Sequence, residues 1–192
     1  MEPQKIKKTS VPYLLACICI PILAIVFMTF IGIFFLTSEI ASAIMMLSVL
    51  ASILWWVLGI KKVYDKKKDE KFKELDATGF NRNHTFNSDN CAVAIDIANG
   101  KIAIVFKWNP SQLYVLPANR ITKIWVDDGN HIGGTSRVSF LFIVDGIKIR
   151  VNTFISNKVW SMKSNNVLEA ISKADMMAAA LNNAAMAAQN PR

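Results

Sequence analysis

The chain has 192 residues, 53% of them hydrophobic, and a formal net charge of +8 at pH 7. Once its two long apolar runs are set aside, what remains suits one small domain of ordinary size. The three cysteines and two histidines form no CxxC pair and show no metal-ligand spacing, which excludes the common zinc and dithiol sites.

The first feature along the chain is a pair of apolar runs, residues 11–36 and 40–60, separated by three residues that include Glu39. Each run is long enough for a helix to cross a hydrocarbon core of about 30 Å, which takes roughly 20 residues. A helix in lipid also satisfies its own backbone hydrogen bonds. Glu39 is the only residue of this region that normally carries a charge, so we place the turn there. The pattern predicts a transmembrane helical hairpin over residues 11–60.

The interior of both runs lacks Asp, Glu, Lys, Arg and His, on which ion pathways and proton relays usually depend. We therefore interpret the hairpin as an anchor. Two processing alternatives stay open: a signal peptide cut after residues 41–43, Ala-Ser-Ala, and a lipoprotein box at residues 14–17. The first run is far longer than the apolar region of a signal peptide. In a lipoprotein the apolar region precedes the cysteine, whereas here it follows.

Lysines flank the hairpin at both ends, whereas the short connection has none. Positive charge beside helix ends marks the cytoplasmic side of a membrane. We therefore expect a multi-pass protein of a bacterial inner membrane with both termini in the cytoplasm. The lysines after the second run are candidates for contact with the membrane surface and with anionic lipid. These candidates are Lys61, Lys62, Lys66, Lys67 and Lys68, and Lys5, Lys7 and Lys8 precede the first run.

The charge and apolar content of the chain change several times along its length, and these changes predict its division into segments. Residues 1–10 form a basic cytoplasmic tail, and residues 11–60 form the hairpin. In residues 61–76 acids and lysines interleave at helical spacing, so this charged connector is expected to be helical. Residues 77–90 are rich in Asn and poor in apolar side chains, so they are interpreted as a linker. Residues 91–190 form the cytoplasmic domain.

Turn signals and alternation predict antiparallel strands in this domain. Asn99-Gly100 and Asp145-Gly146 each stand between two apolar segments, which favours β-hairpins. Apolar and polar residues alternate from Ile147, typical of a strand with one buried face. From Asn166 apolar residues recur at helical spacing and predict a C-terminal helix. Candidates for a basic face toward phosphate groups are Lys148, Arg150 and Lys158, joined by Arg120 and Lys123; a solvated strand face explains them equally well.

One local pattern adds a resemblance. Residues 115–124 have the sequence VLPANRITKI. In this segment an apolar residue is followed by Pro, then by polar residues, and then by two isoleucines three positions apart. By this pattern and by the order of elements, residues 90–189 resemble a pleckstrin-homology-like (GRAM-like) domain of bacterial membrane-anchored proteins. The resemblance implies an α+β fold, in which an antiparallel β-sheet or split barrel carries a C-terminal helix. Such domains bind lipids, bind peptides or act as scaffolds, so the fold does not fix the function.

Few residues could carry catalysis. Asp127, Asp128 and His131 stand together in a glycine-containing loop, but their spacing fits neither a calcium loop nor a phosphate-binding loop. A turn is the simpler interpretation of this loop. We therefore expect no enzyme activity, no metal and no cofactor.

The leading hypothesis is a membrane-anchored binding or scaffolding protein that presents a small cytoplasmic domain to a protein or an anionic lipid. The alternative is an oligomeric membrane effector, whose hairpin perturbs or permeabilises the bilayer under control of the soluble domain. The expected partners are the lipid bilayer and an unidentified cytoplasmic protein; an anionic lipid and a second copy of the chain stay open. Nucleic acid is not expected, because no helix carries clustered basic and aromatic residues.

Overall fold

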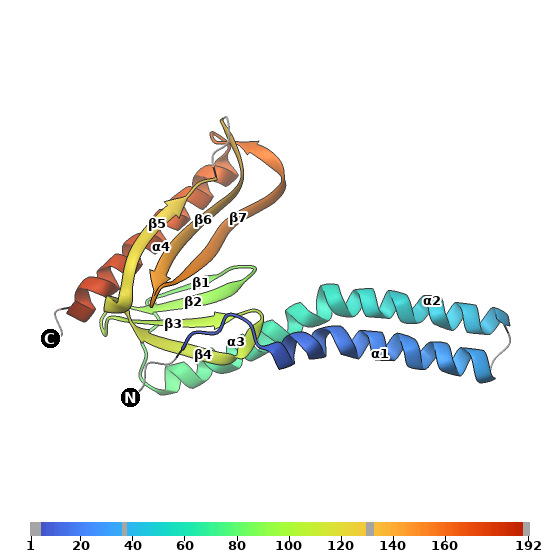
Figure 1. Cartoon of the computed structure of the whole chain (residues 1–192). Helices are drawn as coiled ribbons and strands as arrows, with labels where there is room; N and C mark the ends of the chain where they lie inside the picture. Colours follow the sequence, from blue (N-terminus) through green and yellow to red (C-terminus); the bar gives the residue numbers. More distant parts are fainter. Residues whose placement is uncertain (1–4, 36–37, 130–132, 190–192) are drawn as a thin grey trace.

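The computed structural model describes residues 5–35, 38–129 and 133–189. Two apolar helices lie at one end of the molecule, and a β domain with a long C-terminal helix lies at the other (Figure 1). The helices are α1 (Val11–Phe35), α2 (Ser38–Leu54), α3 (Ile60–Ala77) and α4 (Asn165–Gln189). The strands are β1 (His84–Asn87), β2 (Cys91–Asp96), β3 (Lys101–Phe106), β4 (Asn109–Pro117), β5 (Ile121–Asp127), β6 (Gly134–Val144) and β7 (Ile147–Ser161).

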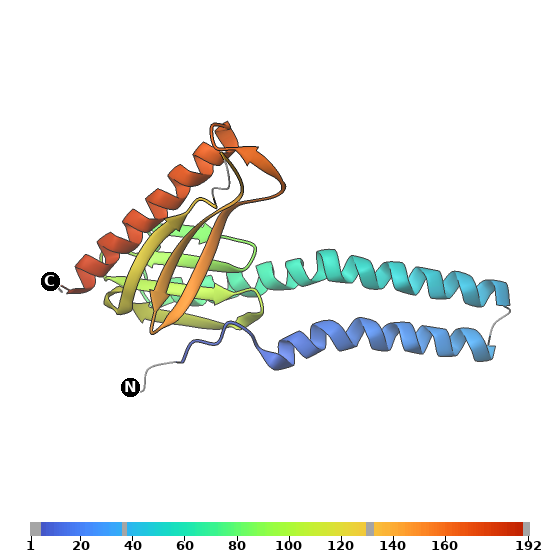
Figure 2. The same cartoon turned by 45° about the horizontal axis from the view of Figure 1, so that its top comes forward.

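The helices α1 and α2 lie side by side along their length (Figures 1 and 2). Within α1, the 22 residues Val11–Gly32 have a mean hydropathy of 2.9 and are long and apolar enough to cross a membrane. The apolar part of α2, Ser42–Leu54, is shorter. Among the described residues, one helix therefore meets the requirements for a span, whereas the sequence predicted two.

The second apolar run falls short because its regular α-helix ends at Leu54. A π-helical turn follows over Trp55–Gly59, and α3 then begins at Ile60. Within this turn the Trp55 ring lies directly against Gly59, where a Cβ would be only 2.7 Å from Trp55 Cε3. Such π turns interrupt α-helices locally without ending them, and Figure 1 shows α2 and α3 as one continuous rod. The hydrogen-bonded helix therefore passes from the apolar run into the charged connector, where a helix was predicted.

Two antiparallel sheets form the β domain. One sheet has the order β1-β2-β3-β4, and the other has the order β5-β6-β7. In the described residues no strand ladder joins β4 to β5, so of the two arrangements that the resemblance implied the strands form open sheets and not a closed barrel. The fold is α+β, as predicted, with α4 packed against β5, β6 and β7 and against the short 3-10 turn at Ala118–Arg120.

The main core lies between the two sheets and α4. Its largest fully buried side chains come from all three layers, among them Ile104, Phe140 and Leu181. A second cluster lies where α3 crosses the outer face of the first sheet, through Phe72 and Leu75. The sheet residues under α3 are mostly small, namely Ala92, Ala94 and Ala103 beside Val105. Because both faces of β2 and β3 are covered, these strands consist almost entirely of apolar residues.

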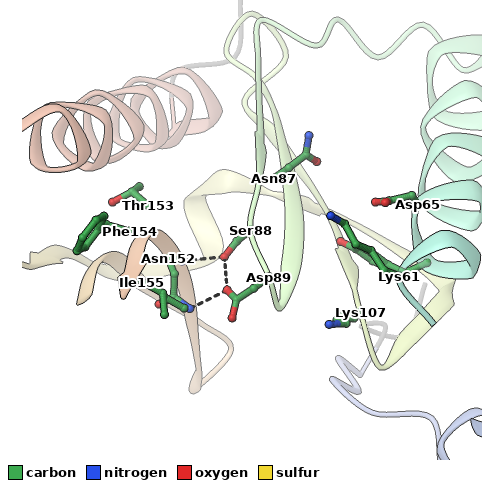
Figure 3. A pocket seen from close by; sticks show the side chains of 11 residues that line it. Lys61, Asp65, Asn87, Ser88, Asp89, Lys107, Asn152, Thr153, Phe154 and Ile155 are labelled. Carbon is green, nitrogen blue, oxygen red and sulfur yellow. Dashed lines mark hydrogen bonds between the residues drawn. The ribbon is translucent and has the colours of Figure 1, made fainter. Parts of the chain in front are cut away.

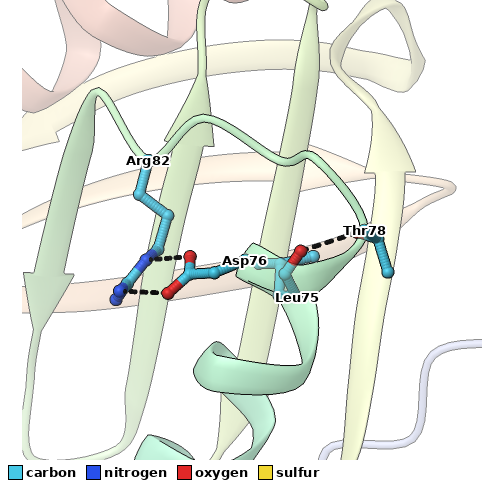
Figure 4. Close-up of polar contacts among 4 residues, drawn as sticks. All are labelled: Leu75, Asp76, Thr78 and Arg82. Atoms are coloured by element: carbon cyan, nitrogen blue, oxygen red, sulfur yellow. Dashed lines mark hydrogen bonds and ion pairs between the residues drawn. The ribbon is translucent and has the colours of Figure 1, made fainter.

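Polar contacts fix the end of α3 and the turn of the chain toward β1 (Figure 4). The Thr78 hydroxyl donates a hydrogen bond to the carbonyl oxygen of Leu75 at 2.6 Å. Arg82 then reaches back to Asp76, and both of its hydrogen bonds to the carboxylate are 2.6 Å long. A bidentate pair of this kind holds the two groups in one geometry, so the direction of the chain after α3 is set.

Two segments that the sequence placed outside the β domain, a tail and a linker, pack into it. The expected linker, residues 77–90, contains β1, whose Phe86 is buried in the main core. The expected N-terminal tail places Ile6 in the same core with 6% of its surface exposed. One or two apolar residues in each segment are enough to hold it, and so few leave no periodicity to recognise.

The two predicted hairpin turns differ from each other. Asp145 and Gly146 both have positive φ, at 51° and 76°, as a two-residue turn requires. The turn between β2 and β3 is longer and runs from Ile97 to Gly100, and in it only Gly100 has positive φ. Asn99 instead binds the buried carboxylate of Asp96, with its side-chain amide at 2.7 Å and its backbone N–H at 3.0 Å.

Candidate functional site

Two neighbouring pockets are among those that open where the β domain meets the helices. They share three walls, namely the β1–β2 turn, the β3–β4 turn and the strand β7. The first, which we call the α3 pocket, has a volume of about 500 Å³ and is closed on one side by Lys61, Tyr64 and Asp65 of α3. The second, the tail pocket, has a volume of about 420 Å³ and is closed by Lys8 and Thr9 of the N-terminal segment.

Backbone contacts assemble the tail pocket from distant parts of the chain. The Lys8 ammonium donates a hydrogen bond to the carbonyl oxygen of Lys148 on β7. The Asn90 side-chain amide donates to the carbonyl oxygen of Arg150 at 2.7 Å, which ties the β1–β2 turn to β7. The Ser10 N–H donates to the carbonyl oxygen of Trp108 at 2.8 Å. These three bonds bring the N-terminal segment and the two turns together with β7, and the first of them also fixes the Lys8 side chain.

The tail pocket is electropositive. Lys8, Lys148 and Arg150 line it, whereas no Asp or Glu is among its described lining residues, and Arg150 pairs with the carboxylate of Asp127 at 3.2 Å. The Lys148 ammonium also lies 5.2 Å from the centre of the Trp125 ring on β5. Three cations against one carboxylate leave net positive charge, and an aromatic face beside a lysine supports its charge through the cation–π interaction. The arrangement suits a phosphate or carboxylate group.

The α3 pocket has mixed charge (Figure 3). Lys61 and Asp65 both come from α3 and lie on one side of it with Lys107, and Figure 3 shows the Asp89 carboxylate on the other side, bound to β7. The Asn152 amide donates to Asp89 Oδ1 at 2.8 Å, and the Ser88 hydroxyl donates to the same oxygen at 2.8 Å. These bonds tie the β1–β2 turn to β7 and leave two lysines and one carboxylate, that of Asp65, near α3.

Two buried polar atoms of the α3 pocket make no hydrogen bond within the described residues: the Tyr64 hydroxyl and Asn152 Oδ1. Burial, followed by the nearby Cys91 and Asp65, raises the pKa of Tyr64 well above its ordinary value. The hydroxyl therefore stays protonated at neutral pH and can donate. Buried polar groups normally have partners, so the pocket offers one unused donor and one unused acceptor.

Cys91 lies close to both pockets but is not a reactive group. It has no exposed surface, and its sulfur lies 3.7 Å from the Arg150 carbonyl oxygen. Burial, together with the charge of Asp89, raises the pKa of the thiol to about 12. A thiol at this pKa is almost entirely protonated at neutral pH and is a poor nucleophile.

The predicted membrane-surface lysines of α3 have different surroundings. Lys61 lines the α3 pocket, and Lys62 and Lys66 are exposed. Lys67 donates to the Ser111 hydroxyl at 3.0 Å and lies 5.6 Å from the ring centre of a tyrosine in α1. Lys68 pairs with two aspartates of α3, with distances of 3.4 and 3.5 Å. Lys61, Lys62 and Lys66 thus make no hydrogen bond or ion pair with the described residues.

The predicted basic face is divided by the structure. Lys148 and Arg150 line the tail pocket together, and Lys123 joins them through Trp125, whose ring centre lies 5.2 Å from its ammonium. Lys158 lies farther along β7, beyond the residues that line either pocket. Arg120 donates two hydrogen bonds to the Asp145 carboxylate, one of them 2.8 Å long.

The residues weighed for catalysis do not form a site in the described structure. Asp127 pairs with Arg150 and accepts a hydrogen bond from the Gly129 N–H at 3.2 Å, as in a turn. His131 lies outside the described residues. Across residues 5–35, 38–129 and 133–189, no three His, Cys, Asp or Glu side chains gather as metal ligands would.

Sequence reasoning missed three contributors to the tail pocket: Lys8, Asn90 and Trp108. Lys8 was grouped with the tail, and Asn90 was placed at the end of a linker. Their role depends on contacts across the fold, which no local pattern encodes. The available signal was the aromatic residue next to a lysine at Lys107-Trp108, repeated with one residue between at Lys123 and Trp125.

Comparison with known proteins finds no match to a protein-family model, to a curated protein or to a solved structure.

Proposed function

We propose that this protein is a membrane-anchored binding protein that holds an anionic lipid headgroup in the tail pocket. The helices α1 and α2 form its two-span anchor, and both ends of this anchor face the cytoplasm of a bacterial cell. The β domain lies against the inner membrane on the cytoplasmic side. It acts as a small domain of the pleckstrin-homology-like kind, supported by its two antiparallel sheets and C-terminal helix.

The apolar surface of the helices supports the anchor. Large side chains on them point away from the protein, and Leu23, Phe27 and Met46 have between 64% and 68% of their surface exposed. Soluble proteins rarely expose apolar patches larger than a few hundred Å². The helix from Ser38 through the π turn to Ile60 also reaches about 34 Å at 1.5 Å per residue. That length supports a second crossing beside α1.

The observation that carries the lipid assignment is the meeting of Lys8 with Lys148 and Arg150 in one pocket. Lys8 stands three residues before Val11, where the apolar helix begins. The pocket therefore lies beside the point at which the chain enters the proposed anchor, close to lipid headgroups. Near an anionic leaflet each lysine or arginine contributes about 1 kcal/mol of attraction. A lipid headgroup is the anion most available there, which favours it over an acidic segment of a protein.

The test compares lipid retention by two charge-matched variants of the full-length protein. The protein, in a mild detergent, is mixed with equal amounts of phosphatidylglycerol and phosphatidylcholine, and the bound lipid is counted by native mass spectrometry. We expect preferential retention of phosphatidylglycerol. Replacing Lys148 and Arg150 by Gln removes two cations and should weaken retention by about tenfold or more. The control replaces Lys73 and Lys173, both exposed on helices, by Gln.

Equal retention by the pocket variant and its control would overturn the lipid assignment. So would a protein captured by crosslinking through the tail pocket while the lipid preference stays unchanged, because the anion would then belong to a protein partner. The anchor is tested separately, since a spanning protein resists extraction from membranes by alkaline carbonate.

A further inference from the structure

The strand β7 departs from its partner near its end. Ile155 stands opposite Arg137 on β6, and Trp160 stands opposite Thr135. One residue of β6 therefore faces four residues of β7, Ser156–Val159, and these four bulge out of the sheet. We call Ser156–Val159 the β7 arch. Bulges of this kind re-aim side chains.

The arch has a defined conformation. The Ser156 hydroxyl accepts a hydrogen bond from the Trp160 indole N–H at 2.8 Å and a second from the Lys158 N–H at 3.1 Å. The Trp160 ring meets the Phe154 ring nearly edge-on, with 6.2 Å between ring centres. At the base, a Cβ on Gly134 would lie 2.6 Å from Val159 Cγ1, so the glycine lets β7 return close to β6. The arch is thus closed by contacts of its own.

Large apolar side chains are concentrated on the arch and its flanks. Val159 is 71% exposed, Ile155 is 52% exposed and Trp160 is 39% exposed. Of the other described strand residues, only Val115 is a large apolar side chain with comparable exposure. Lys158 is exposed among them. Segments that lie at a membrane–water interface have this composition, in which Trp and branched aliphatic residues stand beside a Lys.

The arch also lies on the side of the molecule that faces the proposed membrane. In both views the bend of β7 points toward the side on which α1 and α2 extend, and it reaches about as far in that direction as the start of α1 (Figures 1 and 2). The start of α1 is where the apolar span begins, at Val11. The arch therefore reaches the level at which the surface of the bilayer would lie.

We propose that the β7 arch inserts into the headgroup region of the same membrane that α1 and α2 cross. Val159 and Ile155 enter the boundary between headgroups and acyl chains, Trp160 sits at headgroup level, and Lys158 reaches lipid phosphate. The proposal rests on the anchor described under Proposed function, but not on a lipid in the tail pocket. It adds a contact that fixes how the β domain is tilted on the membrane.

The test places an environment-sensitive fluorophore, NBD, on the arch of the full-length protein in liposomes. Cys17 and Cys19 are replaced by Ser, and Cys91 is kept because it is fully buried. NBD is attached at Val159→Cys. The matched control is Asn183→Cys, an exposed position near the far end of α4. We expect blue-shifted emission and strong quenching by nitroxide-labelled lipid at Val159, and quenching by aqueous iodide at Asn183.

A second label at Ile155→Cys guards against disturbance of the arch by the first, and it should report the same insertion. Equal quenching by iodide at Val159, at the flanking Ile155 and at Asn183, in protein that resists carbonate extraction, would overturn the proposal. Blue-shifted emission without quenching by labelled lipid would also overturn it, because protein rather than lipid would then cover the arch. Extraction by carbonate would remove the anchor itself and the arch contact with it.

Discussion

The Tyr114 hydroxyl on β4 donates a hydrogen bond to the Lys7 carbonyl oxygen and accepts one from the Lys7 N–H, each 3.0 Å long. Tyr114 is 2% exposed, so both bonds are shielded from water. The pair fastens the segment before α1 to the first sheet, while α3 fastens the other end of the helix pair. The β domain is therefore attached to the helices at two points, which restricts its rotation about α3.

Replacing Tyr114 by Phe should loosen the first attachment. The variant keeps the ring but leaves the Lys7 N–H without its partner, which should cost about 1–2 kcal/mol of unfolding free energy. The segment before α1 should then be cut faster by trypsin at its lysines, as followed by intact-mass spectrometry of the full-length protein. The control, Thr122→Val, removes an exposed hydroxyl from β5. An unchanged cleavage rate at Tyr114→Phe would show that burial of Ile6 and the hydrogen bonds of Lys8, Ser10 and Asn109 hold this segment without the Tyr114 hydroxyl.

A second prediction concerns Asp96, a fully buried carboxylate at the end of β2. Burial alone would raise its pKa, but hydrogen bonds from Asn99 and from the Asn81 N–H outweigh it, so the pKa is lowered. A lowered folded-state pKa contributes stability that is present above the ordinary Asp value of about 4 and is lost below it. Melting curves from pH 6 to pH 3 should therefore show a loss of stability at the acid end.

Asp96→Asn should lower stability at pH 6 by about 1–3 kcal/mol, because an amide accepts fewer hydrogen bonds than a carboxylate. It should also reduce the acid-dependent loss. The control is Asp175→Asn, an exposed position on α4. If wild type and Asp96→Asn lose stability equally between pH 6 and pH 3, other carboxylates are responsible for the acid sensitivity.

Alanine substitutions at two glycines with positive φ should distinguish the cost of backbone strain from the cost of a packing clash. Gly100 and Gly79 have φ of 58° and 79°, so alanine is strained at either position. A Cβ at Gly100 would lie 2.5 Å from the Ala188 backbone nitrogen of α4, whereas nothing lies within 4 Å of one at Gly79. We expect Gly79→Ala to cost about 1–2 kcal/mol and Gly100→Ala about 1–3 kcal/mol more. Chemical unfolding of the full-length protein in detergent measures both, and equal losses would mean that α4 shifts freely.

These contacts also explain what could be predicted from the sequence. The charged helix α3, the strands around Asp145-Gly146 and the C-terminal helix follow from local spacing, and the structure has them. The attachment of Lys7 to Tyr114 and the role of Lys8 in the tail pocket depend on partners more than 100 residues away. The β7 arch was hidden for another reason. Ser156, Asn157 and Lys158 are three polar residues in a row, so the alternation of the strand stops before them, and only the pairing of Trp160 with Thr135 shows that β7 continues beyond the arch.

The last prediction concerns the contact that closes the β7 arch. Ser156→Ala removes the acceptor for the Trp160 indole N–H and for the Lys158 N–H. Both groups can bond to water instead because the arch is exposed, so global stability should fall by less than about 1 kcal/mol. Amide hydrogen exchange should rise locally over residues 154–161 in detergent, where no bilayer covers the arch. Ser172→Ala, an exposed serine on α4, is the control. Unchanged exchange at residues 154–161 would assign closure of the arch to the contact between Phe154 and Trp160, and Phe154→Leu would then open it.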